Sequence, residues 1–494
     1  GNLSSMVVDH FKKDIFIMND QDMYRWDGIN LSYLKKRVYP PGEWLLNNMD
    51  PDGRTSVIYA PATVLSENRY PGSYRLHFAN TVDGSYAFDT SSNKFTDHFL
   101  PGRKVSNSFI DTEQNTWFST LGEGIYKMPS KGIKTIKPAK QNTQYEPQIY
   151  SITKFEDHII AGMNNSKAML VKDGQTLEPY DYSAYLSRAL NSRTYNRLST
   201  LKLLSTGDLI LGFDNFLVKK SGTTSTLNFI EPIKTVCEID KEHILVGTSR
   251  FAFKVKLNGL EIIDTIWRER CTNVFVHDQK YYIGTLTGLY EVNEDKRFKY
   301  LGDLSPFLKR RINDITADAD GIIWVATNDE GVVGYQHGKI IRMINDKNGL
   351  SSNICKTLFV KDEYLWIGTN KGLNKVNLHD DKKSVIKYSV ADGLPSDIIN
   401  AVYIDDDLIW LGTPAGLVYF KEKDITSKSV CKLVLLGVTI ADSLMPVRND
   451  YDLSYKENSI LIEYSGISFK SGKELIYHYN LEGLDSEWRE TSEN

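Results

Sequence analysis

A short signature recurs along most of this chain. Its clearest copies read YYIGTLTGLYEV from Tyr281, IWVATNDEGVVGY from Ile323, LWIGTNKGLNKV from Leu365 and IWLGTPAGLVYF from Ile409. Each copy places an apolar run before a turn with glycine and a second apolar run after it, the pattern of two strands joined by a hairpin. Repetition on this scale predicts that the chain folds as an array of similar units.

Six weaker copies precede these four, which makes ten units. One aligned position defines a signature residue in each unit: Phe16, His77, Trp117, Ile160, Ile210, Leu245, Tyr282, Trp324, Trp366 and Trp410. The spacings between successive signature residues run from 35 to 50, except for the first, which is 61 and predicts a diverged unit or a long insertion.

A segment with the strand period of two stands upstream of each signature, as in INDITADADG from Ile312 and NICKTLFVKDE from Asn353. Three visible strands and a more variable fourth in each unit are the content of a propeller blade, in which four-stranded sheets pack around an axis. No 3.6-residue periodicity persists, which argues against helical repeats. We therefore predict an all-β chain of β-propeller repeats.

The residue types of the signature have structural explanations. The large signature residue is expected to fill the space between blades, and the Gly or Ala that follows it allows neighbouring sheets to approach closely. The Thr and the turn Gly then shape the hairpin. We expect the signature tryptophans to pack between blades and not to contact a ligand.

Composition and charge exclude several other classes. Apolar residues make up 41% and aromatic residues 11% of the 494 residues, as in a folded, aromatic-rich protein. The formal net charge of -4 gives no global field for polyanions, so we expect no bound nucleic acid. The cysteines show no metal-type spacing and are expected to be buried free thiols: Cys237, Cys271, Cys355 and Cys431.

Two longer segments resemble a known family. DGLPSDIINAVYIDDDLIWLGTPAGLVYF from Asp392 and NGLSSNICKTLFVKDEYLWIGTNKGLNKV from Asn348 are similar to the two-component-regulator propeller repeat. Downstream, LSYKENSILIEYSGISFKSGKELIYHYNLEGLDSEWRET from Leu453 resembles the small β-sandwich called the triple-tyrosine domain. The residues that carry this second likeness are Tyr464, Tyr477, Tyr479, Gly483 and Trp488.

In that family, this order of domains forms the periplasmic sensor of Bacteroidetes hybrid histidine kinases and of some one-component regulators. The resemblance implies an extracytoplasmic sensor that responds to a glycan-derived oligosaccharide, forms a homodimer in the intact receptor and signals across the membrane to control transcription. Membrane anchoring and any kinase or DNA-binding output would belong to segments outside this chain. The chain itself is expected to be no enzyme and to need no cofactor.

The resemblance also suggests a division of the chain, because family members usually carry two seven-bladed propellers. We expect a partial N-terminal propeller of about three blades in residues 1–140 and a seven-bladed propeller in 141–427. An Ig-like β-sandwich, truncated at its C-terminal end, would occupy 428–494. A single ring of ten blades is the alternative.

A candidate ligand site follows from the segments that precede the inner strands, since these segments cluster on one face of a propeller. Several are rich in arginine or aromatic residues, which suit a small, acidic ligand such as an oligosaccharide. The candidate ligand-binding residues are Arg193, Tyr195, Arg197, Trp267, Arg268, Arg270, Lys309, Arg310 and Arg311. Alternatively, the arginines are solvated rim charges paired with nearby acids, and the tyrosines of the insertion that begins at Tyr180 cover a blade edge.

No convincing motif for a phosphate-binding loop, a zincin or a hydrolase elbow occurs, and we expect no metal site and no catalytic residue. DPDG from Asp50 and DADG from Asp318 begin like calcium loops but lack the completing glutamate, so hairpin turns explain them better. Two other functions remain open. One is a stand-alone propeller that binds glycans or proteins, and the other is a propeller lyase whose residues form no linear motif.

Overall fold

The structure, a computed structural model, is described in two compact units, Gly1–Met128 and Pro129–Asn494. The described residues are 3–8, 15–19, 22–26, 31–36, 45–49, 55–59, 64–69, 76–89, 94–138, 148–164, 166–185, 196–380, 384–425, 431–469, 475–483 and 485–491. Strands dominate these ranges, as the all-β prediction requires. The helices within them are short 3-10 turns: η1 (Ser183–Tyr185), η2 (Leu301–Asp303), η3 (Pro306–Lys309), η4 (Asp346–Asn348), η5 (Val390–Asp392) and η6 (Glu422–Asp424).

The described strands of the N-terminal unit form four antiparallel sheets. The first sheet consists of β1 (Leu3–Val8), β2 (Ile15–Asn19), β3 (Asp22–Trp26) and β4 (Leu31–Lys36). The hairpin of β5 (Leu45–Met49) and β6 (Thr55–Tyr59) lies in the long gap between the first two signatures. The third sheet contains β7 (Val64–Arg69), β8 (Leu76–Thr81), β9 (Gly84–Asp89) and β10 (Lys94–Phe99), and the last contains β11 (Val105–Ile110), β12 (Thr116–Thr120) and β13 (Ile125–Met128).

In its described ranges, the second unit contains seven four-stranded sheets, here called blades 1 to 7. Blade 1 consists of β15 (Ser151–Phe155), β16 (His158–Gly162), β17 (Lys167–Lys172) and β18 (Gln175–Asp181). Blade 2 consists of β19 (Leu198–Leu203), β20 (Leu209–Phe213), β21 (Phe216–Ser221) and β22 (Thr224–Phe229). Blade 3 consists of β23 (Ile233–Glu238), β24 (His243–Thr248), β25 (Ala252–Lys256) and β26 (Glu261–Trp267). Blade 4 consists of β27 (Asn273–His277), β28 (Lys280–Gly284), β29 (Leu289–Val292) and β30 (Phe298–Tyr300). Blade 5 consists of β31 (Ile312–Ala317), β32 (Ile323–Thr327), β33 (Val332–Gln336) and β34 (Lys339–Ile344). Blade 6 consists of β35 (Cys355–Lys361), β36 (Tyr364–Thr369), β37 (Gly372–Asn377) and β38 (Val385–Tyr388). Blade 7 consists of β39 (Ala401–Asp405), β40 (Leu408–Thr413), β41 (Gly416–Lys421) and β14 (Lys134–Ile136).

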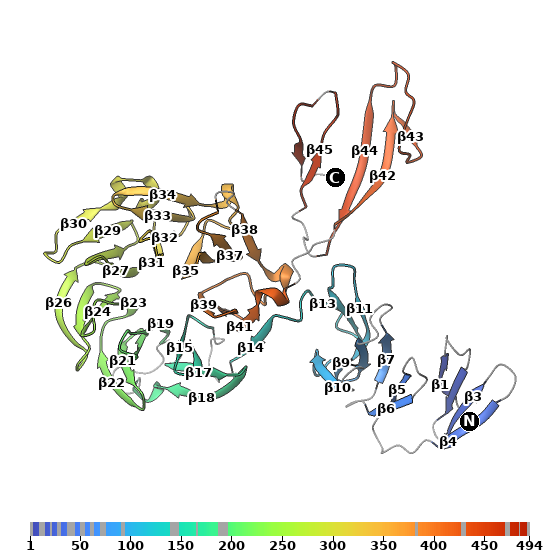
Figure 1. Cartoon of the computed structure of the whole chain (residues 1–494), viewed down its shortest axis with the longest axis horizontal. Coiled ribbons are helices and arrows are strands. Elements are labelled where there is room, and N and C mark those ends of the chain that lie inside the picture. Colours follow the sequence, from blue (N-terminus) through green and yellow to red (C-terminus); the bar gives the residue numbers. More distant parts are fainter. Residues whose placement is uncertain are drawn as a thin grey trace. The chain divides into compact units, whose positions relative to one another are not determined.

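The first strand of each blade lies beside the first strand of the next, and β39 lies beside β15, so the seven blades form a closed ring (Figure 1). The outer strand of blade 7 is β14, which pairs with β41 from Lys134↔Tyr419 to Ile136↔Leu417. On the inner side, the amide of Asn400 donates to the carbonyl of Ile149 at 3.1 Å, 251 positions away in the chain. The seven described four-stranded sheets of this unit therefore form a ring, and the outermost strand that closes it lies upstream of the predicted boundary at residue 141.

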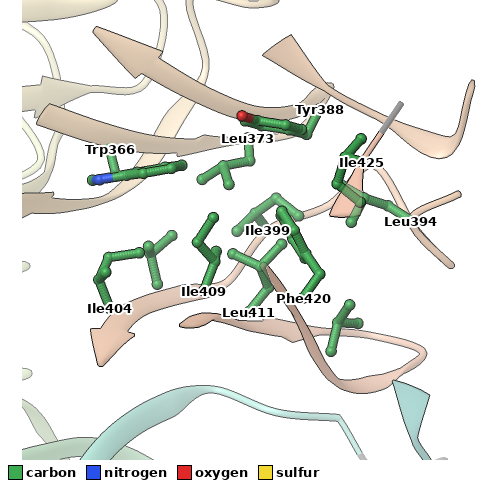
Figure 2. Packing of buried hydrophobic residues seen from close by; sticks show 12 residues of the cluster. Trp366, Leu373, Tyr388, Leu394, Ile399, Ile404, Ile409, Leu411, Phe420 and Ile425 are labelled. Carbon is green, nitrogen blue, oxygen red and sulfur yellow. The ribbon is translucent and has the colours of Figure 1, made fainter. Parts of the chain in front are cut away.

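The hydrophobic core is divided among the spaces between blades. Seven clusters of buried residues each combine two successive blades, and the cluster between blades 7 and 1 completes the circle. Between blades 6 and 7, the buried side chains of Trp366 and Tyr388 face Ile409, Leu411 and Phe420 (Figure 2). Each signature residue of the ring lies on the second strand of its blade and in the cluster shared with the following blade, so the predicted packing role is confirmed.

The other residues of the signature also have the predicted roles. A Cβ added to Gly412 would lie 2.8 Å from Cγ2 of Ile149 in the neighbouring blade, closer than real Cβ contacts allow. The hydroxyl of Thr413 donates to the carbonyl of Gly416 at 2.9 Å and accepts from the N–H of Ala415 at 3.1 Å. Thus the glycine permits close approach of two sheets, while the threonine and the turn glycine, at φ 130°, shape the hairpin.

The C-terminal segment forms a small sheet and a hairpin. The sheet has the order β43 (Ser443–Met445), β42 (Lys432–Ile440), β44 (Ile460–Ile467), and the hairpin is β45 (Tyr477–Tyr479) with β46 (Arg489–Thr491). The rings of Tyr464 and Tyr477 meet edge to face at 4.9 Å, and the Tyr477 hydroxyl accepts a hydrogen bond from the Gly466 N–H at 2.9 Å. Two tyrosines that carry the resemblance therefore join the sheet to the hairpin.

Candidate functional site

Three arginines occupy the same position in three blades. The residue that begins each inner-strand segment donates its backbone N–H to a carbonyl of the preceding blade: Leu198 to Met163 at 2.8 Å, Cys271 to Thr248 at 3.1 Å, and Ile312 to Thr285 at 3.0 Å. We call Leu198, Cys271 and Ile312 anchor residues, together with their counterparts in other blades, which include Ile233 and Cys355. The residues directly before these three anchors are Arg197, Arg270 and Arg311, in blades 2, 4 and 5.

A lysine from the intervening blade reaches the same region. The register of the inner strand shifts by one residue after the anchor in blades 2, 3, 5 and 6, which marks a β-bulge. A bulge redirects a side chain and increases the local twist. In blade 3 the bulge residue is Lys234, and its ammonium lies 3.9 Å from the carboxylate of Asp214 in blade 2.

These cations act on one another electrostatically. The pKa of Lys234 lies below the ordinary value for lysine, first because the side chain is largely buried. Asp214 opposes this shift, and three guanidinium groups add to it, those of Arg197, Arg270 and Arg311. Positive charges nearby disfavour the protonated form of a lysine and so lower its pKa. We call Arg197, Lys234, Arg270 and Arg311 the cationic mouth.

Only part of this charge is neutralised within the described structure. Arg197 donates to Asp214 through Nε and Nη2, each at 3.0 Å, and its backbone N–H donates to the same carboxylate at 2.9 Å. The guanidinium of Arg197 also lies over the ring of Tyr150, 5.8 Å from its centre. By contrast, neither Arg270 nor Arg311 forms an ion pair with any described residue, and both are exposed.

The structure places the other predicted site residues elsewhere or leaves them without a described partner. Arg310 donates to Glu330 at 3.0 Å and lies 3.7 Å from Asp329, so it is a paired rim charge. Arg268 and Lys309 are exposed. Arg193 and Tyr195 lie outside the described residues.

Trp267 does not belong to the cationic mouth. It is the last residue of β26, only 8% exposed, and its ring packs against Tyr290 at 4.7 Å and Phe298 at 5.5 Å. Its aromatic face is therefore used by the core between blades 3 and 4 and is not offered to a ligand.

The tyrosines of the insertion after blade 1 cover a neighbouring blade as far as they are described. Tyr182 lies 5.6 Å from Phe213 in an edge-to-face contact, and Tyr185 lies 6.4 Å from Phe216. Both contacts are made with blade 2, which favours the interpretation of these tyrosines as edge-covering residues.

Two residues of the site were not predicted from the sequence, Lys234 and Asp214. Aligning the inner strands by their anchors would have found Lys234, since the arginines precede the anchor and the lysine follows it. In the unit of blade 2, Phe213 stands where most signatures have a threonine, and Asp214 follows it in the turn. This departure from the repeat was the sequence signal that could have drawn attention to Asp214.

A hollow with a volume of about 450 Å³ lies between blades 6 and 7, at the end of the strands opposite to the cationic mouth. Inside it, the ammonium of Lys375 lies 3.9 Å from the centre of the Tyr364 ring and 2.6 Å from the carboxylate of Glu422. At its rim Asp407 pairs with Lys421 at 3.0 Å. Because these charges already pair with one another, this pocket offers an ionic ligand less than the cationic mouth does.

The described ranges contain no group of three or more His, Cys, Asp or Glu side chains that could hold a metal ion. The carboxylate of Asp318 in the DADG segment instead accepts from the N–H groups of Asp320 at 3.0 Å and Ile322 at 2.9 Å and from the indole N–H of Trp324 at 2.8 Å. Asp318 is thus a turn residue, whereas Asp50 of the DPDG segment lies outside the described residues. In the part of the chain that is described, no helix combines the length and the apolar character needed to span a membrane.

Comparison with known proteins gives one family match and a clear structural likeness. Residues 306–329, which contain Arg310 and Arg311, match the family described as two component regulator propeller. No curated protein matches the chain in sequence. The extracellular domain of a putative hybrid two component system from B. thetaiotaomicron superposes with a TM-score of 0.72 at 17% identity, covering 100% of this chain and 73% of the other.

A virginiamycin B lyase from Staphylococcus aureus is less similar, with a TM-score of 0.46 at 11% identity over 58% of this chain and 98% of the other. At 17% identity, the likeness to the B. thetaiotaomicron domain establishes the fold alone. The likeness to the lyase supports no conclusion about this chain. The chain is therefore an all-β protein with a β-propeller fold, and its family match covers η3 and the first two strands of blade 5.

Proposed function

We propose that this chain is the extracytoplasmic, periplasmic ligand-sensing region of a bacterial signal-transduction receptor, either a hybrid two-component sensor histidine kinase or a one-component regulator. The observation that carries the proposal is the cationic mouth, which lies where inner strands of a closed ring begin. Three arginines at one repeated position, with a lysine between them, form a recognition site that the packing of the blades does not require. The propeller-repeat match and the likeness to the extracellular domain of a hybrid two component system support this assignment.

The ligand in this proposal is an acidic, glycan-derived oligosaccharide. Guanidinium groups form paired hydrogen bonds with anionic oxygens, and a ligand that spans the mouth could meet several of them at once. The proposal includes a partial N-terminal propeller, a seven-bladed propeller and a C-terminal Ig-like sandwich of the triple-tyrosine type. It also includes a homodimer of the intact receptor, whose paired sandwiches would transmit the signal to membrane segments outside this chain.

The test uses the full-length receptor in its bacterial host with a transcriptional reporter. Acidic and neutral oligosaccharides are supplied separately, and the purified ectodomain is titrated with the same compounds by calorimetry. Arg270→Gln and Arg311→Gln should each weaken binding about tenfold or more and shift the reporter response to higher ligand concentration, since hydrogen bonds to charged groups contribute about 1.5–3 kcal/mol.

Arg310→Gln is the matched control, because Arg310 is adjacent to Arg311 but is paired with Glu330. It should leave affinity and response unchanged. Equal affinities for the wild type, Arg270→Gln and Arg311→Gln would show that the cationic mouth is not the sensing site. Light scattering of the full ectodomain should show a dimer, and a monomer at all concentrations would contradict the dimeric receptor.

A further inference from the structure

Lys234 is a largely buried cation that lacks a hydrogen-bond acceptor. Its side chain is 22% exposed, and its nearest described carboxylate oxygen, on Asp214, lies at 3.9 Å, beyond hydrogen-bonding distance. Asp214 is itself committed to Arg197 through three hydrogen bonds. Burying an ammonium without an acceptor costs free energy, as the lowered pKa of Lys234 reflects.

The corresponding residues of other blades satisfy their polar groups within the ring. Ser199 donates to the anchor carbonyl of Ile233 at 2.9 Å, and Asn313 donates to that of Cys355 at 2.7 Å. In blade 6, Lys356 donates to the side chain of Asn400 at 2.6 Å. Within the described ranges, Lys234 makes no such bridge to the next blade, so its ammonium remains available to a ligand.

The next two blades contain two cations that form no ion pair with a described residue. Arg270 and Arg311 occupy equivalent positions in blades 4 and 5, and neither is paired with a described residue. Blades 3, 4 and 5 therefore each contribute one cation that has no hydrogen-bonded acidic partner among the described residues. Because successive blades are rotated about the ring axis, the three side chains start from equivalent ends of inner strands that differ in direction.

The number and directions of these donors distinguish between anionic groups. A carboxylate has two oxygens in one plane and is matched by a single guanidinium fork. An ester of sulfate or phosphate ends in three oxygens that diverge from a tetrahedral centre, and a phosphate ester carries about −1.5 to −2 charges near neutral pH. Three donors from three directions fit the second kind of group better than the first.

We infer that the cationic mouth recognises a tetrahedral oxyanion, a sulfate or phosphate ester on the ligand, held by Lys234, Arg270 and Arg311. The inference rests on the proposed ligand-sensing function and specifies the chemistry of that site. Arg197 has a different role in it: fixed by Asp214 and Tyr150, it borders the site and is not free to follow the ligand.

The experiment compares four probes that differ at one carbon of the same sugar: glucose 6-sulfate, glucose 6-phosphate, glucuronate and glucose. Each is titrated into the full chain by calorimetry at fixed low ionic strength, because exposed charges are screened by salt. The two esters should bind at least about tenfold more tightly than glucuronate, and glucose should show no binding at this site. A preference for the phosphate over the sulfate ester supports the inference and indicates that charge adds to geometry.

Variants locate the binding. Lys234→Met, Arg270→Gln and Arg311→Gln should each reduce affinity for the preferred ester about tenfold or more, with melting temperatures measured to verify folding. Arg310→Gln is the rim control. Lys356→Met is a control at the same bulge position on another part of the ring, and both controls should retain wild-type affinity.

Two sets of results would overturn the inference. Glucuronate binding as tightly as the esters, with the same loss in the three variants, would exclude the oxyanion but leave ligand sensing at the mouth intact. No binding of either ester, or ester binding that none of the three variants weakens, would exclude the oxyanion site altogether. The reporter response to acidic oligosaccharides then decides separately whether the proposed sensing function stands.

Discussion

The carboxylate of Asp314 in β31 accepts a hydrogen bond from the backbone N–H of Leu358 in β35, at 2.8 Å, across the boundary between blades 5 and 6. Its other oxygen accepts from the N–H of Ile315 and from the side chain of Asn273 in blade 4, each at 2.9 Å. One carboxyl thus connects three successive blades, and its desolvation between them raises its pKa from 3.8 to about 6.

This pKa predicts a pH-dependent contribution to stability. Between about pH 4 and about pH 6, the folded state keeps a proton that the unfolded chain has released, so the free energy of unfolding falls as pH rises through this window. A shift of about two pKa units corresponds to about 3 kcal/mol. Urea unfolding measures the free energy of unfolding of the wild type and of Asp314→Asn across this pH window. As pH rises, the free energy of unfolding of Asp314→Asn should increase relative to that of the wild type by about 3 kcal/mol.

Asp314→Ala serves as the comparison. It removes the acceptor for the N–H groups of Ile315 and Leu358 and should reduce stability by about 2–4 kcal/mol at the lower pH values, where the native carboxyl is protonated. A difference between the wild type and Asp314→Asn that does not change with pH would show that this carboxyl titrates normally in the folded protein.

The Asp318 turn gives a second prediction. Asp318→Ala removes the acceptor for two backbone N–H groups and for the indole of Trp324, and it should lower the free energy of unfolding by about 1–3 kcal/mol. Trp324→Phe removes the indole hydrogen bond but leaves the turn, so it tests that bond separately. Because all the hydrogen bonds of Asp318 stay within the hairpin, added calcium should not change the melting temperature of the wild type, and a calcium-dependent rise would restore the calcium-loop interpretation.

The repeated parts of the fold could be predicted from sequence because the same residue type performs the same task in each blade. Trp324, Trp366 and Trp410 all lie on second strands and face the next blade, as their shared signature indicates. By contrast, β14 could not be recognised. It has only three residues, and its partner β41 follows after almost the whole ring, so no local pattern marks the pairing.

The candidate site was predictable only in part, for a related reason. Arg197, Arg270 and Arg311 precede inner strands and could be grouped by position. Grouping the residues that precede inner strands misses Lys234, which follows its anchor, and wrongly includes Trp267, which packs in the core. A bulge directs the lysine toward the mouth, while β26 extends to residue 267 and turns the tryptophan into the core. Which side of a strand end a residue faces depends on register, and register is set by the neighbouring strand.

Gly412 provides a test of how closely the closing blades pack. A Cβ at this position would meet Cγ2 of Ile149 at 2.8 Å and Cβ of Ala401 at 3.1 Å. Gly412→Ala should therefore destabilise the protein by about 1–3 kcal/mol, the usual cost of overpacking a core. Urea unfolding measures this loss.

A second substitution shows whether the clash is the cause. Ile149→Ala removes the atom that the new methyl group would meet. The loss of stability in the double variant should then be smaller than the sum of the two single losses. Additive losses would mean that Gly412→Ala acts through something other than contact with Ile149.

The four cysteines should differ sharply in reactivity. Cys237, Cys271 and Cys355 are buried, and burial raises the pKa of Cys271 and Cys355 to about 12 each, so that almost no thiolate forms near neutral pH. Cys431 is exposed. A colorimetric thiol reagent should therefore react rapidly with one thiol in the native protein and with all four in denaturant. Cys431→Ser should abolish the rapid reaction, whereas rapid labelling of two or more thiols in the native protein would contradict the buried positions between the blades.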